Sequence, residues 1–151
     1  MNERISRFNR ILKIREDSRK NEQAILALER NEEMQVLRRL SELEGEKTQA
    51  IQDFGNNTRV MSSTELWFQR QFIDAIDSDI LRGKDSLQNV RNRISKTEER
   101  LVERHKDVRI METYIDHMKE ASFQEQLGIE QNELDDVATT RFSRVKSNRG
   151  F

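Results

Sequence analysis

The chain has 151 residues, of which 36% are charged and 34% hydrophobic, and it contains neither proline nor cysteine. Because globular domains usually have ~45–50% apolar and glycine residues, this composition argues against a large compact core and favours long helices with solvated polar faces. Basic and acidic side chains are balanced, 27 against 28, and the lack of cysteine excludes a disulfide framework and thiol chemistry.

The first predicted element is a helix over about residues 4–53, a stretch without strong helix breakers. Nine residues fit one heptad phase: Ile5, Phe8, Leu12, Leu26, Val36, Leu40, Leu43, Ala50 and Phe54. Charged residues interrupt the middle of this phase, namely Arg15, Arg19, Glu22, Glu29 and Glu33. A second apolar stripe, Ile11, Ile14, Ile25 and Leu28, runs beside them. We therefore expect the packed face to rotate to this stripe, with local fraying or a shift in register.

A turn over residues 54–63 separates this helix from the next one. Gly55, Asn56 and Asn57 tolerate positive φ and end helices readily. Ser62 and Glu65 then have the spacing of a capping box, in which the serine hydroxyl accepts a backbone N–H. The second helix is therefore predicted to begin at about residue 64.

The second predicted helix spans about residues 64–142 and is followed by a flexible basic tail, residues 143–151. Counting in sevens from Leu66 gives aliphatic residues at nine of ten positions, which is typical of a coiled coil. A coiled coil packs along a seam formed by two positions of each heptad, and Leu66 begins the first of them. The second seam position is weaker, because Gly83, Thr97 and Arg104 interrupt its apolar residues. This seam predicts a partner helix bound without great stability.

These elements predict an all-α fold: one coiled-coil domain over residues 1–151, built as a long antiparallel two-helix hairpin. With the turn near residue 57, residue 4 should lie near residue 110. Helix 2 would then overhang helix 1 by about 30 residues, or roughly 45 Å at ~1.5 Å per residue. The overhang carries Ile115, Met118, Ile129, Leu134 and Val137. An unpaired amphipathic helix of this kind is a candidate for insertion into another protein.

The aromatic residues gather just after the turn, in the stretch ELWFQRQFIDAIDSDI at residues 65–80. At ~100° per residue, Phe68, Phe72 and Ile76 form a stripe that leaves the seam for the helix flank, whereas Trp67 points the other way. Two interpretations stay open. Trp67 and Phe68 cover Phe54, Val60 and Met61 at the turn, or they form an exposed apolar patch for docking a protein.

The sequence indicates no catalytic or metal site. A two-helix hairpin has almost no interior from which to exclude water, and no phosphate-binding loop or metal-ligand spacing occurs. His105 and His117 are twelve residues apart and point about 120° away from each other, as surface residues would. We expect no enzyme activity and no cofactor. With a net charge of −1 and no aromatic residues among the basic ones, we also expect no nucleic-acid binding.

The N-terminus is charged throughout, and no apolar run is long enough to cross a bilayer. These features predict a cytoplasmic protein without a secretory signal.

Nearly the whole chain resembles the FliJ family of flagellar type III export proteins. It resembles the YscO-type stalk proteins of injectisomes almost as closely. The resemblance rests on the order and spacing of FNRILKIRE, WFQRQFIDAIDSDI and ELDDVATTRF. It implies an antiparallel coiled coil like the stalk of rotary ATPases, whose free ends enter a hexameric export ATPase. Its members help that ring assemble, bind the cytoplasmic linker of the export-gate membrane protein and handle export chaperones. Such a stalk is cytoplasmic, lies peripherally at the inner membrane and is expected to be monomeric outside the complex.

The resemblance also implies site residues. In the family an aromatic and an aliphatic residue four apart carry export-gate binding, and Phe72 and Ile76 match them here. Phe68 joins them, with Leu40 and Leu43 on helix 1, although Lys47 replaces an aromatic residue there. The C-terminal motif supplies Leu134, Asp135 and Arg141 for ATPase-ring binding. The basic ends add Arg4, Arg7 and Arg144, which we expect to steer the chain toward an acidic ring interior.

Two other functional classes stay open at this point. The chain could be a generic coiled-coil adaptor that homodimerises through the unpaired part of helix 2. Alternatively, it could be a small holdase-type chaperone that uses the apolar stripe for many clients.

Overall fold

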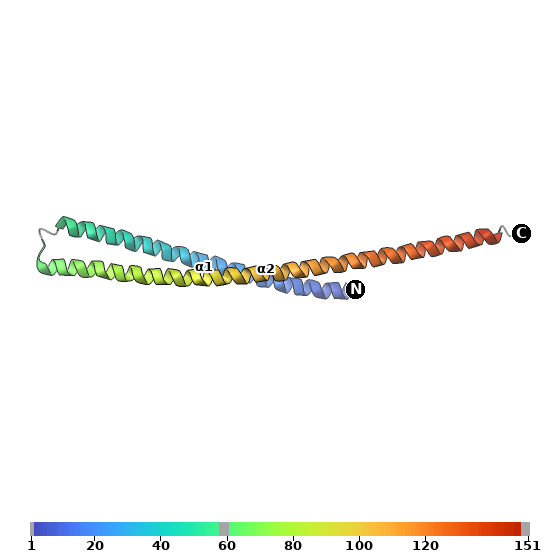
Figure 1. Cartoon of the computed structure of the whole chain (residues 1–151), viewed down its shortest axis with the longest axis horizontal. Coiled ribbons are helices and arrows are strands. Elements are labelled where there is room, and N and C mark those ends of the chain that lie inside the picture. The colour runs from blue at the N-terminus through green and yellow to red at the C-terminus, as the bar shows by residue number, and fades with distance from the viewer. Residues whose placement is uncertain (1, 58–60, 149–151) are drawn as a thin grey trace. The chain divides into compact units, whose positions relative to one another are not determined.

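A computed structural model of the chain describes residues 2–57 and 61–148. These residues form two helices, α1 (Asn2–Asn57) and α2 (Ser63–Asn148), as Figure 1 shows. The two helices pack against each other, so the predicted all-α helical hairpin is confirmed. Their contacts group into a hairpin unit, residues 19–103, and a terminal unit, residues 1–18 with 104–151. Each unit packs part of α1 against part of α2.

The segment between the helices is shorter than the predicted turn over residues 54–63. Helix α1 continues to Asn57 rather than ending near residue 53, and Gly55 lies inside its last turn. None of the described residues has a positive φ, so Gly55 keeps a helical backbone instead of terminating the helix. The predicted cap of α2 is confirmed, because the Ser62 hydroxyl accepts the Glu65 N–H at 3.3 Å. Residues 58–60 of the predicted turn lie outside the described residues.

The C-terminal end of α2 is also longer than predicted. Residues 143–148 are helical where a flexible tail was expected, and residues 149–151 lie outside the described range. No glycine or proline interrupts the chain after Gly128 until residue 150. Lys146 lies in the last turn, where its charge interacts favourably with the carbonyl end of the helix. The basic composition of this end therefore stabilises a helix rather than excluding one.

The hairpin unit is held by apolar side chains from both helices. One cluster joins Leu40, Leu43 and Ala50 of α1 to Ile76 and Ile80 of α2. A second cluster joins Leu26 of α1 to Val90 and Ile94 of α2. Ion pairs beside these clusters are Lys47–Asp77, Glu33–Arg91, Glu32–Arg93 and Arg30–Glu98. Residue numbers rise along α1 as they fall along α2, which establishes the antiparallel arrangement.

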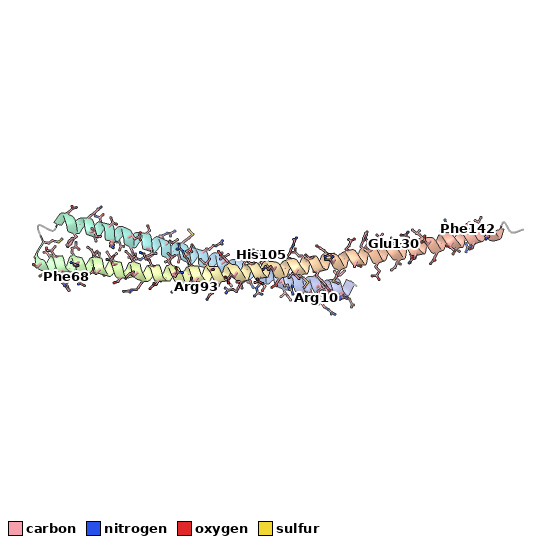
Figure 2. All side chains as sticks on the ribbon, in the orientation of Figure 1. Arg10, Phe68, Arg93, His105, Glu130 and Phe142 are labelled. Atoms are coloured by element: carbon pink, nitrogen blue, oxygen red, sulfur yellow. The ribbon has the colours of Figure 1, made fainter. Side chains whose placement is uncertain are left out.

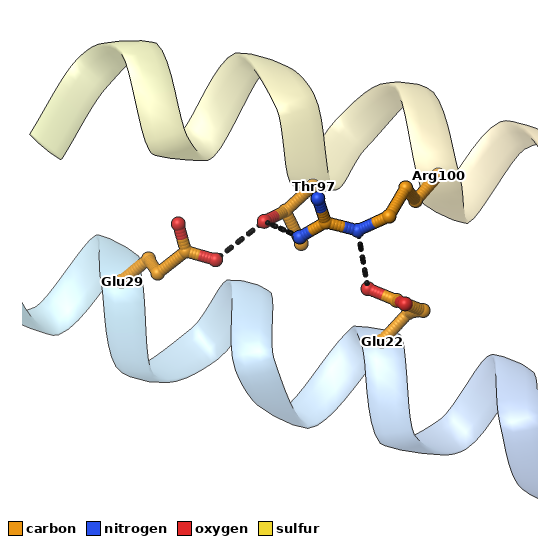
Figure 3. A network of polar contacts seen from close by, with 4 residues as sticks. All are labelled: Glu22, Glu29, Thr97 and Arg100. Atoms are coloured by element: carbon orange, nitrogen blue, oxygen red, sulfur yellow. Dashed lines mark hydrogen bonds and ion pairs between the residues drawn. The ribbon is translucent and has the colours of Figure 1, made fainter.

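The charged positions in the middle of α1 remain in the seam. Glu22, Glu29 and Thr97 are buried, and Thr97 has no exposed surface. The Thr97 hydroxyl donates to Glu29, and Arg100 donates to Thr97 at 2.9 Å and to Glu22 at 3.3 Å (Figure 3). The buried carboxylates thus have hydrogen-bond donors, which makes their burial tolerable.

This seam overturns the expectation that the packed face rotates to the second apolar stripe. Ile14 and Leu28 are 68% and 71% exposed, and Ile25 is also exposed. The helix is continuous through this region, without the predicted fraying. Hydrogen bonding of Glu22 and Glu29 across the seam lets α1 keep a single heptad phase, and a polar group at a seam position fixes the register of two helices.

Gly83 interrupts the heptad pattern of α2, and the side chain of Leu40 fills the space that a side chain at residue 83 would occupy. A Cβ atom at Gly83 would lie 2.6 Å from Leu40 Cδ2, closer than any ordinary contact. The missing side chain therefore makes a hole into which Leu40 packs, as a knob enters a hole in a coiled coil. At Gly83, which the sequence analysis counted as a weak seam position, the two helices therefore fit closely together.

The terminal unit packs the beginning of α1 against α2. Val108, Met111 and Ile115 are buried there, and the rings of Phe8 and Tyr114 meet edge to face at 5.1 Å. The predicted register, with residue 4 near residue 110, is wrong by about two helical turns. The register was counted from residue 57, but α1 is still helical there and the chain reverses later. Each residue added before the reversal shifts the pairing by two. Ile115 is consequently a core residue and not part of the overhang.

Replacing Thr97 by valine tests the polar seam. The variant keeps the shape of the side chain but removes the hydrogen bond to the buried Glu29 carboxylate. We expect Thr97→Val to lower the free energy of unfolding by about 1–3 kcal/mol in urea titrations followed by circular dichroism. Thr113→Val, at an exposed position of the same helix, should change it by less than about 0.5 kcal/mol. Equal effects of the two variants would show that the network adds nothing to stability.

Candidate protein-binding surfaces

An exposed aromatic surface lies at the turn end of the hairpin unit. Trp67, Phe68 and Phe72 are each more than half exposed, and we call them the tip surface (Figure 2 labels Phe68). The rings of Trp67 and Phe68 pack edge to face at 5.1 Å. Burying these rings in an interface would remove a large apolar area from water, so the arrangement favours the docking interpretation over a cover for the turn.

Helix geometry explains why Phe72 stays outside the core. Its neighbours Ile73 and Ile76 pack in the cluster around Leu43, which leaves Phe72 on the flank of α2. Across from this flank, Lys47 pairs with Asp77 at 2.6 Å. Since the helices are antiparallel, Ile51 lies one turn closer to the hairpin end, level with Phe72, and is 48% exposed. The sequence analysis did not single out Ile51, because Ile51 lies outside the heptad phase counted along this helix.

Three of the predicted gate-binding residues lie in the core. Ile76 is 4% exposed and belongs to the same buried cluster as Leu40 and Leu43. The expectation that Ile76 leaves the seam together with Phe68 and Phe72 is therefore wrong. The physical reason is that an i, i+4, i+8 stripe drifts around the helix, and its third member has reached the seam. Only Phe68 and Phe72 of the predicted set present accessible side chains.

The N-terminal end of α1 is basic and exposed. Arg4 and Arg7, which the sequence analysis assigned to ring binding, are both exposed. A shallow depression on this helix is lined by Glu3, Ser6, Arg7 and Arg10. Because Arg7 and Arg10 outweigh Glu3, this surface favours a negatively charged partner.

Helix α2 continues past the residues that pack against α1. Every side chain from Phe123 to Lys146, here the C-terminal segment, is exposed (Figure 2 labels Glu130 and Phe142). Leu134 is 69% exposed, and Asp135, Arg141 and Arg144 are also on the surface. All four residues predicted for this end are thus accessible, although Asp135 lies about 100° around the helix from Leu134.

The C-terminal segment carries an apolar stripe that the sequence analysis only partly identified. Phe123, Leu127, Leu134 and Val137 follow heptad spacing and are each 42–69% exposed. Only the last two were singled out, because the count in sevens from Leu66 follows a different phase. Leu127 lies about 120° around α2 from Ile115, the last buried seam residue. A second heptad count started within the segment would have found this stripe.

The remaining sequence-predicted groups form no compact site. His105 and His117 are both exposed, in agreement with the surface positions predicted for them. Within residues 2–57 and 61–148, no group of three or more metal-ligating side chains comes together. None of the helices described is both long enough and apolar enough to cross a membrane.

The different burial of Phe72 and Ile76 can be tested by truncating each side chain. Ile76→Ala removes methyl groups from the core and should lower the free energy of unfolding by about 2–5 kcal/mol. Phe72→Ala removes an exposed ring and should change it by less than about 0.5 kcal/mol. Urea unfolding followed by circular dichroism measures both values. A loss of stability in Phe72→Ala as large as that in Ile76→Ala would place Phe72 in the core.

Comparison of the sequence with known proteins identifies its family. The family model described as Flagellar FliJ protein matches residues 4–147. No curated protein and no solved structure shows a significant match. The family comprises stalk proteins associated with flagellar export and is not a known family of enzymes. Since the match covers nearly the whole chain, the protein belongs to the FliJ family.

Proposed function

We propose that the chain is the central stalk of the flagellar protein export apparatus. In this role it inserts its two free ends into the hexameric export ATPase and regulates that ring. It also binds the cytoplasmic linker of the export-gate membrane protein, so that ATP hydrolysis is linked to export. The observation that carries the proposal is the C-terminal segment, a helix of a FliJ-family protein with every side chain exposed.

Ring insertion is supported by the chemistry of the two ends. A helix that enters a ring needs accessible side chains on all its faces, and the C-terminal segment has them. Its apolar residues, including Leu134, can be buried there. Arg4, Arg7, Arg141 and Arg144 are exposed on the two chain ends. They supply positive charge that would accelerate association with an acidic ring interior.

Gate binding is supported by the tip surface. Aromatic side chains are frequent hot spots of protein interfaces, because one ring buries a large area at little cost in conformational entropy. Phe72 has this character, and its exposure leaves it available. The buried residues Ile76, Leu40 and Leu43 contribute by holding the two helices in place beneath this surface. The proposal therefore assigns contact to Phe68 and Phe72, and support to the other three.

The proposed location follows from these partners. A stalk bound to an ATPase ring and to a membrane-protein linker is cytoplasmic and lies peripherally at the inner membrane. The family resemblance adds export chaperones to the expected partners.

Gate binding predicts a selective effect of Phe72→Ala. The variant should bind the isolated cytoplasmic linker at least about tenfold more weakly in isothermal titration calorimetry, as expected for a hot-spot aromatic residue. Its helicity and its stimulation of the ATPase should stay unchanged. Leu81→Ala is the matched control, because Leu81 is 65% exposed on the same helix but outside the tip surface. Equal linker affinities of the two variants would remove the tip surface from the proposal.

Ring binding predicts a dependence on the charge of the free ends. Reversing Arg4, Arg7, Arg141 and Arg144 to glutamate should slow association with the export ATPase about tenfold or more at low salt. The difference should shrink as salt screens the charges. A control variant reverses Arg38, Arg70, Lys84 and Lys96, which are exposed away from the ends. Stopped-flow or surface-binding kinetics measure the association rates across salt concentrations. If both variants associate as fast as the wild type at every salt concentration, the charges of the free ends do not steer association.

A further inference from the structure

The stripe of the C-terminal segment contains one acidic and one basic residue. At ~100° per residue, eight residues fall within an arc of about 100°: Phe123, Leu127, Glu130, Leu134, Val137, Ala138, Arg141 and Val145. Six of them are apolar, and all eight are exposed. In heptad terms, Leu127, Leu134 and Arg141 occupy one seam position, whereas Phe123, Glu130, Val137 and Arg144 occupy the other.

The middle of this arrangement, residues 130–141, is complementary to itself when one copy is reversed. In an antiparallel pair of helices, the first seam position of one chain faces the second seam position of the other. If the two-fold axis lies between Leu134 and Val137, these residues meet across it. Glu130 then faces Arg141 of the other copy, and the two-fold symmetry repeats that ion pair. A parallel pair would instead place Glu130 against Glu130 and Arg141 against Arg141, so like charges disfavour it.

Charges outside the stripe have the same polarity along the segment. Glu133, Asp135 and Asp136 lie in its middle, whereas Arg144 lies near its end. Antiparallel pairing brings the acidic part of each copy beside the basic end of the other. Such complementarity fixes orientation and register more than it adds affinity.

We propose that two copies of the chain associate through their C-terminal segments as an antiparallel helical pair, with Glu130 of each copy opposite Arg141 of the other. The residues that pack against α1 end before Phe123, so both segments are accessible for pairing. The seam has few apolar layers, and small interfaces of this kind give transient complexes. The inference departs from the expected monomer and does not rest on the proposed function. If the segment also enters the ATPase ring, ring binding and self-pairing exclude each other.

Charge exchange on the full chain tests the pairing. Sedimentation velocity from about 1 to 200 µM, the range for a weak interface, should show the wild type shifting from monomer to dimer. Glu130→Arg and Arg141→Glu should each weaken dimerisation at least about tenfold, because like charges then meet at two symmetric places. The double variant Glu130→Arg with Arg141→Glu should recover dimerisation, since the ion pairs are restored in reverse.

The controls carry the same charge changes on the opposite side of the segment. Glu125→Arg and Lys146→Glu lie outside the stripe and should dimerise like the wild type. Circular dichroism would verify that every variant keeps its helicity. The proposal is overturned if the wild type remains a monomer throughout, if the single variants dimerise normally, or if the double variant fails to recover.

Disulfide cross-linking tests the orientation separately, because the chain has no cysteine of its own. A mixture of Leu134→Cys and Val137→Cys chains should form a mixed disulfide under mild oxidation, whereas each variant alone should react slowly. Rapid self-linking of Leu134→Cys alone would indicate a parallel pair and contradict the proposal.

Discussion

The burial of seam residues between antiparallel helices is the interaction on which the other features of this protein depend. In the hairpin unit it places Ile76 and Ile80 against Leu40 and Leu43. A side chain that points into this seam is removed from water, and one on the flank remains available. Phe72 and Ile76 are only four residues apart and bear the same resemblance to the family pattern, yet the seam buries Ile76 and leaves Phe72 exposed. Only Phe72 is therefore accessible to a partner.

Polar residues in the seam add specificity to this interaction. A seam made only of leucine and isoleucine would pack in more than one register, because neighbouring heptads would be equivalent. Glu22 and Glu29 can be buried only where Arg100 and Thr97 supply donors, so a slip by one heptad would leave carboxylates without partners. Beside them, the Arg93 guanidinium donates to Glu32 at 2.8 Å and holds the pKa of that carboxyl below its ordinary value. That exposed pair adds little to stability but agrees with the same register.

The seam also determines what is left without a partner. Beyond Ser122, α2 presents apolar side chains on a face different from the one buried against α1. The proposed ring insertion and the proposed self-pairing both use this segment, and both are ways of removing Phe123, Leu127 and Leu134 from water. The dimer requires only the charge order within this chain, whereas ring insertion requires a complementary surface on another protein. Experiments on the isolated chain therefore test self-pairing, and experiments on its complex with the ATPase test ring insertion.

The sequence alone determined the two helices, their antiparallel pairing, the cap at Ser62 and most seam positions of α2. These features follow from local rules: heptad spacing, hydroxyl capping and the absence of proline. The tertiary structure decided where the reversal falls, because Gly55 stays helical, and so it decided that Ile115 is buried and that the segment beyond Ser122 is exposed. It also decided that Glu22 and Glu29 pack in the seam while Ile25 and Leu28 face water. Hydropathy alone predicts the reverse, since it contains no information about the donors that the facing helix brings to a buried carboxylate.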